Sequence, residues 1–242
     1  MMPFAEVART SHAPAGPVRF AQLFSKTPRI ASGLSFFVVG ALFFAVYIRI
    51  GATEIALLAA QIAGAYLLSK VIAFDLLPLD RKIPLLRRPT HWFVAQTGVL
   101  SSSVLCAFLS PTPAAYSCLV VYSLLGFYCA AKLGCWNVGC CSARRAIATM
   151  PTQLPLFEAA LAASSAIAVL VLAARRQNID AVLFGSVALV AIRIASLILQ
   201  RRYARQVRRE LYITTGLLAL LMLVCFGDRS ASPILELWRP NS

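Results

Sequence analysis

The sequence predicts an all-α, polytopic membrane protein, a bundle of about seven transmembrane helices. Hydrophobic residues make up 60% of the chain and charged residues 13%, whereas soluble domains average about 45–50% and about 25%. A soluble core of this length buries only about 70–75% of the unfolded surface, so the apolar excess needs lipid as its solvent. The apolar residues also gather in runs close to the ~20 residues that a spanning helix requires.

Seven apolar runs separated by short connections are the expected spans. In lipid, each run must pair its own backbone groups, which favours helices over an open sheet. The runs are Ala31–Ile50, Ala52–Phe74, Trp92–Leu109, Thr112–Ala131, Pro155–Ala173, Ala181–Leu199 and Leu211–Gly227. The chain contains no internal repeat and no low-complexity segment, so we expect one transmembrane domain over residues 31–227. A polar N-terminal tail (1–30) and a short C-terminal tail (228–242) would flank it.

The tail over residues 1–30 lacks the apolar core and the small-residue cleavage site of a secretory signal peptide. We therefore expect the first span to act as the targeting signal. The net charge of +14 does not predict a nucleic-acid partner, because the basic residues lie between the apolar runs and form no soluble basic domain.

The basic residues predict an orientation. The tail and the connections 75–91, 132–154 and 200–210 carry sixteen Lys and Arg residues, and the opposite connections with the C-terminal tail carry five. Cytoplasmic loops are enriched in Lys and Arg. The charge distribution therefore predicts a cytoplasmic N-terminus and an outward-facing C-terminus.

Ionisable residues at membrane depth are energetically costly and usually functional. Arg193 lies near the middle of the sixth span, Glu158 one turn into the fifth, and Lys132 at the end of the fourth. We expect Arg193 to face a polar cavity and to pair with a carboxylate or a ligand's phosphate. Lys132 and Glu158 either reach the interface along their own side chains or take part in function. Glu54 and Lys70 lie nearer the ends of their span, and we expect them to be interfacial.

The most unusual segment reads Lys132-Leu133-Gly134-Cys135-Trp136-Asn137-Val138-Gly139-Cys140-Cys141. Its two glycines permit close backbone approach or a break in a helix. The cysteine spacing is not that of a CxxC site and no histidine lies nearby, so we expect neither a metal site nor a cofactor. A disulfide among the three cysteines is possible if the segment faces outward.

A second segment follows: Met150-Pro151-Thr152-Gln153-Leu154-Pro155-Leu156-Phe157-Glu158. Together the two segments resemble the signature of the prolipoprotein diacylglyceryl transferase family. Lys132-Leu133-Gly134-Cys135 and Gly139-Cys140-Cys141 are similar to its glycine-rich part. Pro151-Thr152-Gln153-Leu154, followed by Glu158, is similar to its Pro-(Ser/Thr)-Gln-Leu-x-Glu part, with two extra residues before the glutamate. The family also carries seven spans and an arginine in its penultimate span, where Arg193 lies.

The resemblance implies an enzyme of lipoprotein biosynthesis, embedded in the bacterial cytoplasmic (inner) membrane. It would move a diacylglyceryl group from phosphatidylglycerol to the lipobox cysteine thiol of a prolipoprotein. The leaving glycerol phosphate is anionic and needs fixed cations, and the attacking thiol must lose its proton to a base. By this resemblance Lys132, Glu158 and Arg193 are the catalytic residues. The substrate-binding residues would be Gly134, Asn137, Gly139 and Gln153.

The chain departs from the family at several positions. Lys132 replaces the signature arginine, which keeps the charge but loses the two-pronged guanidinium. Cys140 stands at an acidic position, and the family's histidine has no counterpart, so no base is assigned. The family's signature faces outward, whereas the charge distribution places Lys132–Leu154 in the cytoplasm. The alternative is a non-enzymatic multi-pass protein that binds lipid, serves as a transporter subunit or assists assembly.

Overall fold

A computed structural model describes residues 26–76, 91–138, 154–199 and 204–236, and within these ranges every regular element is a helix and short turns join some of them. The elements are α2 (Lys26–Phe43), η1 (Phe44–Ile48), α3 (Ala52–Leu76), α4 (Trp92–Leu109), α5 (Pro113–Val138), α6 (Leu154–Ala174), α7 (Asn178–Leu199) and α8 (Ala204–Glu236). Among the described residues, seven helices are long and apolar enough to cross a membrane. The predicted fold class, a helical membrane bundle, is confirmed.

The helix bounds differ most from the predicted spans in α5 and α8. α4 coincides with its predicted span, whereas α5 continues to Val138. The segment Lys132–Val138 is therefore the last two turns of a helix and not part of a connection. α8 runs for 33 residues from Ala204 to Glu236, about 50 Å at 1.5 Å per residue. This length exceeds the ~30 Å of a hydrocarbon core, so α8 extends beyond the membrane-spanning residues.

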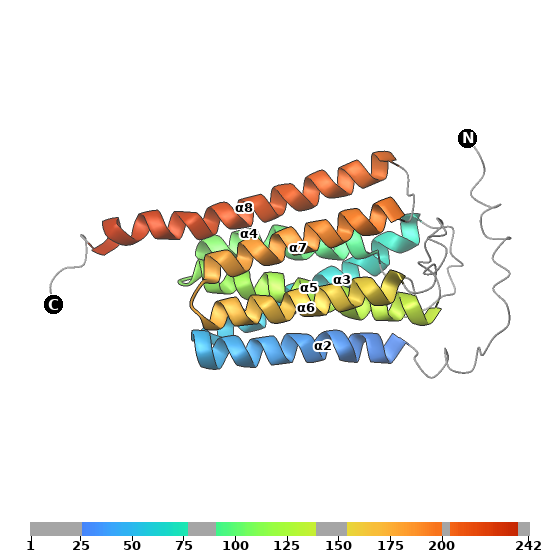
Figure 1. Ribbon diagram of the computed structural model, residues 1–242. Coiled ribbons are helices and arrows are strands. Elements are labelled where there is room, and N and C mark those ends of the chain that lie inside the picture. Colours follow the sequence, from blue (N-terminus) through green and yellow to red (C-terminus); the bar gives the residue numbers. More distant parts are fainter. Residues whose placement is uncertain (1–25, 77–90, 139–153, 200–203, 237–242) are drawn as a thin grey trace, which may run out of the picture.

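The helices run antiparallel to their neighbours in sequence, which gives the bundle two distinct ends (Figure 1). α2, α4, α6 and α8 begin at the end where α3, α5 and α7 finish. The connections at this end are those rich in Lys and Arg, and we call it the basic end. At the opposite end the turns are short, and Arg49 and Arg176 adopt positive φ values of 61° and 58°.

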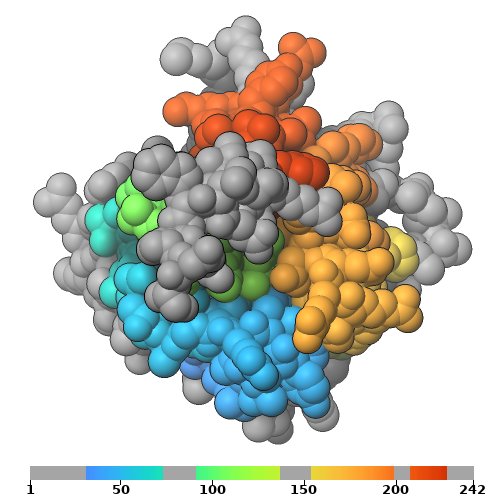
Figure 2. Space-filling view, turned by 90° about the vertical axis from the view of Figure 1, so that its left-hand side faces the viewer, coloured from blue at the N-terminus to red at the C-terminus, as the bar shows by residue number. Residues whose placement is uncertain are grey.

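α5 is the central helix of the bundle. Of its membrane-spanning residues 78% are buried, against 22–44% in the other spans. Figure 2 looks along the bundle from the end opposite the basic end, with blue segments at the bottom and left, orange at the right and orange-red at the top. Helices approach α5 closely where glycine allows it. A Cβ at Gly40 would collide with Tyr122, and one at Gly185 would collide with Val121 and Val169. Small residues at such crossings are typical of membrane helix packing.

The polarity of this bundle is that of a protein solvated by lipid. Large apolar side chains such as Leu42, Phe108 and Leu223 are more than 60% exposed. Many polar side chains are buried instead: Ser69, Lys70, Gln96, Ser103, Ser117, Ser123, Lys132, Glu158, Ser186, Ser196, Glu210 and Thr214. Lys70 differs from its predicted interfacial position. It is buried, with its ammonium 4.7 Å from the centre of the Tyr66 ring, because it lies on a face of α3 that turns into the protein.

Candidate functional site

A buried ion pair joins α5 to α6 near the basic end. Lys132 Nζ pairs with Glu158 Oε2, and the two residues are only 6% and 2% exposed. Tyr128 lies one turn before Lys132 on α5, so its side chain shares the same helix face. Its hydroxyl donates a hydrogen bond to Glu158 Oε2 at 3.2 Å, and Lys132 Nζ lies 5.2 Å from the centre of its ring. Glu158 Oε2 is thus held by both residues of α5.

α7 connects this pair to a second one. Lys132 Nζ donates a hydrogen bond to Ser196 Oγ at 3.3 Å. Arg193 lies three residues before Ser196 and hence on the same face of α7. Its Nη2 pairs with Glu210 Oε2 of α8 at 2.5 Å, and Glu210 is 4% exposed. We call Tyr128, Lys132, Glu158, Arg193, Ser196 and Glu210 the ion-pair cluster.

The ion-pair cluster balances its formal charge, with two cations and two carboxylates. Burying an isolated charge in an apolar medium is very costly, whereas paired charges are tolerated. One acceptor is left over: Glu158 Oε1 is buried and receives no hydrogen bond from the described residues. A buried carboxylate oxygen without a donor is uncommon in folded proteins. It is the atom of the cluster best placed to take a proton or to meet a ligand's donor.

α4 forms the wall beside the cluster. The Trp92 and Tyr128 rings meet edge to face, with their centroids 5.3 Å apart. Gln96, one turn further along α4, donates from Nε2 to Thr214 Oγ1 of α8 at 3.1 Å. Trp92 Nε1 and Thr97 Oγ1 are buried and make no hydrogen bond among the described residues. The polar interior therefore extends from α5–α8 to the start of α4.

Three predicted site residues come together in the cluster: Lys132, Glu158 and Arg193. Arg193 pairs with a carboxylate, as expected from its depth. Lys132 and Glu158 are buried against each other, which excludes the interpretation that they extend to the interface. Gly134 and Cys135 follow Lys132 on the last turns of α5. Asn137 belongs to the same helix, but its side chain is not described. The remaining predicted residues lie outside the described residues: Gly139, Cys140, Cys141 and Gln153.

Sequence reasoning missed Tyr128, Ser196 and Glu210. Glu210 was assigned to a connection, yet a signal for it existed. Arg193 lies six residues before the end of α7, and Glu210 lies six residues after the start of α8. Consecutive antiparallel helices place such residues at equal depth. A buried Arg193 therefore predicts its partner at the matching position on α8.

A second polar network lies in the bundle between α3, α4 and α5. Gln61 Oε1 accepts hydrogen bonds from Ser103 Oγ at 3.0 Å and Tyr116 Oη at 3.1 Å. Gln61 Nε2 donates to Cys106 Sγ at 2.7 Å. Glu54, at the start of α3, accepts a hydrogen bond from the Ser110 hydroxyl. These groups satisfy one another, as buried polar networks must, and we assign them to helix packing.

Among the described residues no group of three His, Cys, Asp or Glu side chains is placed to hold a metal ion. The fold and the lipid-facing surface define a multi-pass α-helical membrane protein. No protein-family model matches the chain, and no curated protein and no solved structure is similar enough to indicate a relative.

Proposed function

We propose that this chain is a phospholipid-dependent transferase that moves a diacylglyceryl group from phosphatidylglycerol to a cysteine thiol of a prolipoprotein. The observation that carries the proposal is the convergence of Lys132, Glu158 and Arg193. The resemblance assigned these residues a common site, and they belong to three separate helices. All three lie in one buried cluster at the basic end of the bundle.

The proposed chemistry forms a bond between the thiol sulfur and a glyceryl carbon of the donor, and breaks the bond from that carbon to the phosphate oxygen. Glycerol phosphate leaves with the electron pair, and the thiol proton must go to a base. Glu158 is our candidate for that base, because its Oε1 is buried and accepts no hydrogen bond from the described residues. Protonation of Glu158 would also remove the counter-charge of Lys132. The Lys132 ammonium would then stabilise the departing phosphate.

The test uses purified protein in detergent with phosphatidylglycerol and a lipobox-cysteine peptide, and it measures the peptide's mass. The proposal expects a gain of one diacylglyceryl group, lost in Lys132→Ala and in Glu158→Gln. Glu54→Gln is the matched control, since Glu54 is a hydrogen-bonded carboxylate outside the cluster, and this variant should keep the activity. A characterised transferase run alongside establishes that the peptide is competent. No mass gain under those conditions refutes the proposal.

One observation favours the alternative of a non-enzymatic multi-pass protein. Each cation of the cluster is already paired with a carboxylate, as in an ion pair that only joins helices. The alternative expects an apolar double variant, Lys132→Met with Glu158→Leu, to fold and to keep whatever the protein does in cells. The transferase proposal expects that variant to fold and to be inactive.

A further inference from the structure

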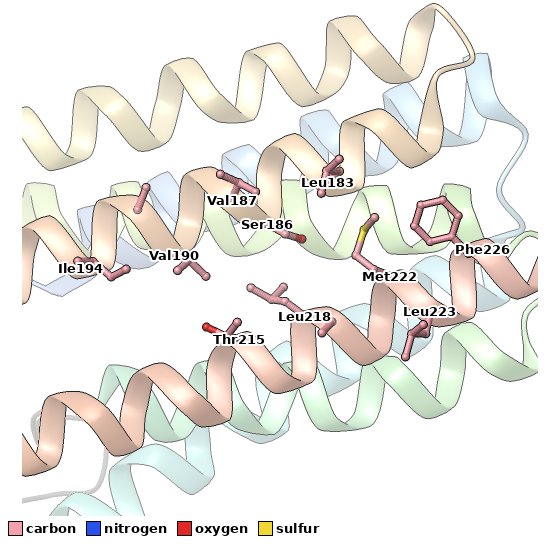
Figure 3. A pocket seen from close by; sticks show the side chains of 12 residues that line it. Leu183, Ser186, Val187, Val190, Ile194, Thr215, Leu218, Met222, Leu223 and Phe226 are labelled. Atoms are coloured by element: carbon pink, nitrogen blue, oxygen red, sulfur yellow. The ribbon is translucent and has the colours of Figure 1, made fainter.

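A groove runs between α7 and α8 from near the ion-pair cluster toward the opposite end of the bundle. It has a volume of about 680 Å³. Side chains of both helices face one another across it, with Leu183, Ser186 and Val190 on α7 and Thr215, Leu218 and Met222 on α8 (Figure 3). Ten of its twelve lining side chains are apolar, and the hydroxyls of Ser186 and Thr215 are the exceptions. Nothing in the cluster's proposed chemistry uses this space.

The groove opens toward the lipid. Its rim carries four apolar residues that are about half exposed: Leu183 at 48%, Val187 at 58%, Leu223 at 65% and Phe226 at 47%. In a membrane such an opening is filled either by lipid chains or by another helix. The choice between these occupants depends on the size of the groove and on the charge at its end.

The dimensions favour a hydrocarbon chain. The lining residues extend from Thr215 to Phe226 on α8 and from Leu183 to Ile194 on α7, about 17 Å at 1.5 Å per residue. At the basic end the lining begins four residues inside the α7 span, Asn178–Ile198, and seven residues inside the α8 span, Arg208–Gly227. A chain that descends from that end therefore enters the groove about 6–11 Å below the end of the spans. Spread over the length of the lining, the volume gives a mean cross-section of about 40 Å². A helix with its side chains, about 10–12 Å across, needs roughly twice that area or more.

The charge at the basic end favours an anionic headgroup. Arg208 and Arg209 lie six to seven residues before Thr215 on α8, and both side chains are exposed. That separation is about 9–11 Å along the helix. The Arg193–Glu210 pair is neutral as a unit, so among the side chains of α8 that the structure describes, these two exposed arginines carry the net positive charge at this end. Arginine binds phosphate through two parallel hydrogen bonds, and basic residues beside a span attract anionic lipids.

We propose that the groove between α7 and α8 binds an acyl chain of an anionic phospholipid from the leaflet at the basic end, with the phosphate at Arg208 and Arg209. The site stands whether or not the chain is a transferase, because it uses no residue of the ion-pair cluster. Its occupant is a whole lipid that remains bound, and no covalent step is involved.

The test uses the purified full chain in mixed micelles with phosphatidylglycerol that carries a photoactivatable diazirine in one acyl chain. Crosslinked residues are mapped by mass spectrometry. We expect labelling of 183–194 and 215–226 at least fivefold above that of Leu105 and Phe108, which are exposed on α4. Ala219→Trp fills the groove and should lower its labelling at least threefold. Leu220→Trp, at the adjacent position and outside the lining, should leave it unchanged.

Ala191→Phe, from the α7 wall of the groove, provides a second blocking variant in case Ala219→Trp fails to fold. The same diazirine in phosphatidylcholine tests the headgroup, and it should label the groove at least threefold less than phosphatidylglycerol does. Arg208→Gln with Arg209→Gln should abolish that preference.

Two labelling results would overturn the proposal. One is uniform labelling of all exposed helix faces, and the other is groove labelling that neither blocking variant changes. A dimer that either blocking variant dissociates would assign the groove to a second copy and overturn it too. Loss of peptide modification in Glu158→Gln, with groove labelling intact, would separate this site from the transferase proposal.

Discussion

The Lys132–Glu158 pair can be tested by removing one charge at a time. Glu158→Gln retains a side chain that can accept from Tyr128 but removes the carboxylate paired with Lys132. Both residues are at least 94% buried, so the ammonium loses its counter-charge in a medium of low polarity. Breaking a buried pair from one side costs about 3–5 kcal/mol. For a chain of this size that corresponds to a fall in Tm of about 6–20 °C.

The double variant Lys132→Met with Glu158→Leu separates charge pairing from side-chain packing. Replacing both members of a buried ion pair with apolar residues of similar size is often neutral or stabilising. We therefore expect most of the lost stability to return. Tyr128→Phe is the control, because it removes one neutral hydrogen bond worth about 0.6 kcal/mol on average in membrane proteins.

The assay is thermal unfolding in detergent, followed by the intrinsic fluorescence of the three tryptophans, of which Trp92 packs its ring against Tyr128. A double variant whose loss of stability equals the sum of the two single losses would refute the reasoning. In that case Lys132 and Glu158 would contribute separately, and the cluster would not act as a coupled unit.

Three further predictions concern stability in the same assay. Arg193→Met should lower the free energy of unfolding by about 3–5 kcal/mol, and adding Glu210→Leu should restore most of it; additive losses would contradict the pairing. Gly185→Leu should destabilise by about 1–3 kcal/mol or more because α5 and α6 already fill the space around it. Its control, Gly216→Ala, meets nothing within 4 Å and should stabilise by up to about 1 kcal/mol. Arg176→Gly should stabilise by about 1 kcal/mol, since a left-handed backbone disfavours a side chain, and a loss of stability would show that the Arg176 side chain matters more.

Much of the fold could be predicted from composition and run length, because lipid imposes the same length on every span. The fourth run predicted a helix ending near Ala131. Gly134, Trp136 and Asn137 then lowered the apparent hydropathy, although α5 continues to Val138. Burial explains part of the difference, since Lys132 and Gly134 are buried in the protein and this face of α5 does not need apolar residues. The sequence also did not predict which helix lies at the centre of the bundle, because the hydropathy of the fourth run does not distinguish it from the other spans.

The sequence predicted three of the six residues of the ion-pair cluster. Lys132, Glu158 and Arg193 were prominent because charge at membrane depth is rare. Tyr128 and Ser196 resemble ordinary span residues and acquire a role only through the contacts of α5 and α7. Lys132 lies six residues before the end of α5, and Glu158 four residues after the start of α6. These offsets differ by two residues, about 3 Å along a helix. Comparing depths in this antiparallel helix pair would therefore have placed Glu158 close to Lys132, although the match is less exact than that of Glu210 with Arg193.

The orientation of the bundle separates the two functional proposals. Helices α2 and α8 both begin at the basic end, so α8 carries the chain away from it. The distribution of Lys and Arg predicts that the basic end faces the cytoplasm. Removing Lys132 from the count leaves fifteen basic residues against five, so the cluster itself does not create this bias. Transfer to an exported thiol, as the family resemblance implies, requires the opposite orientation.

The orientation can be measured with two reporters fused after Ser242. Alkaline phosphatase is active only outside the cytoplasm, and the paired reporter is a fluorescent protein that folds only in the cytoplasm. An active phosphatase with a dark fluorescent fusion would refute transfer to an exported thiol. It would not contradict the lipid site between α7 and α8, whose lipid would then belong to the cytoplasmic leaflet. The reverse result would remove the main objection to the transferase, and it would require Arg208 and Arg209 to bind lipid in the outer leaflet.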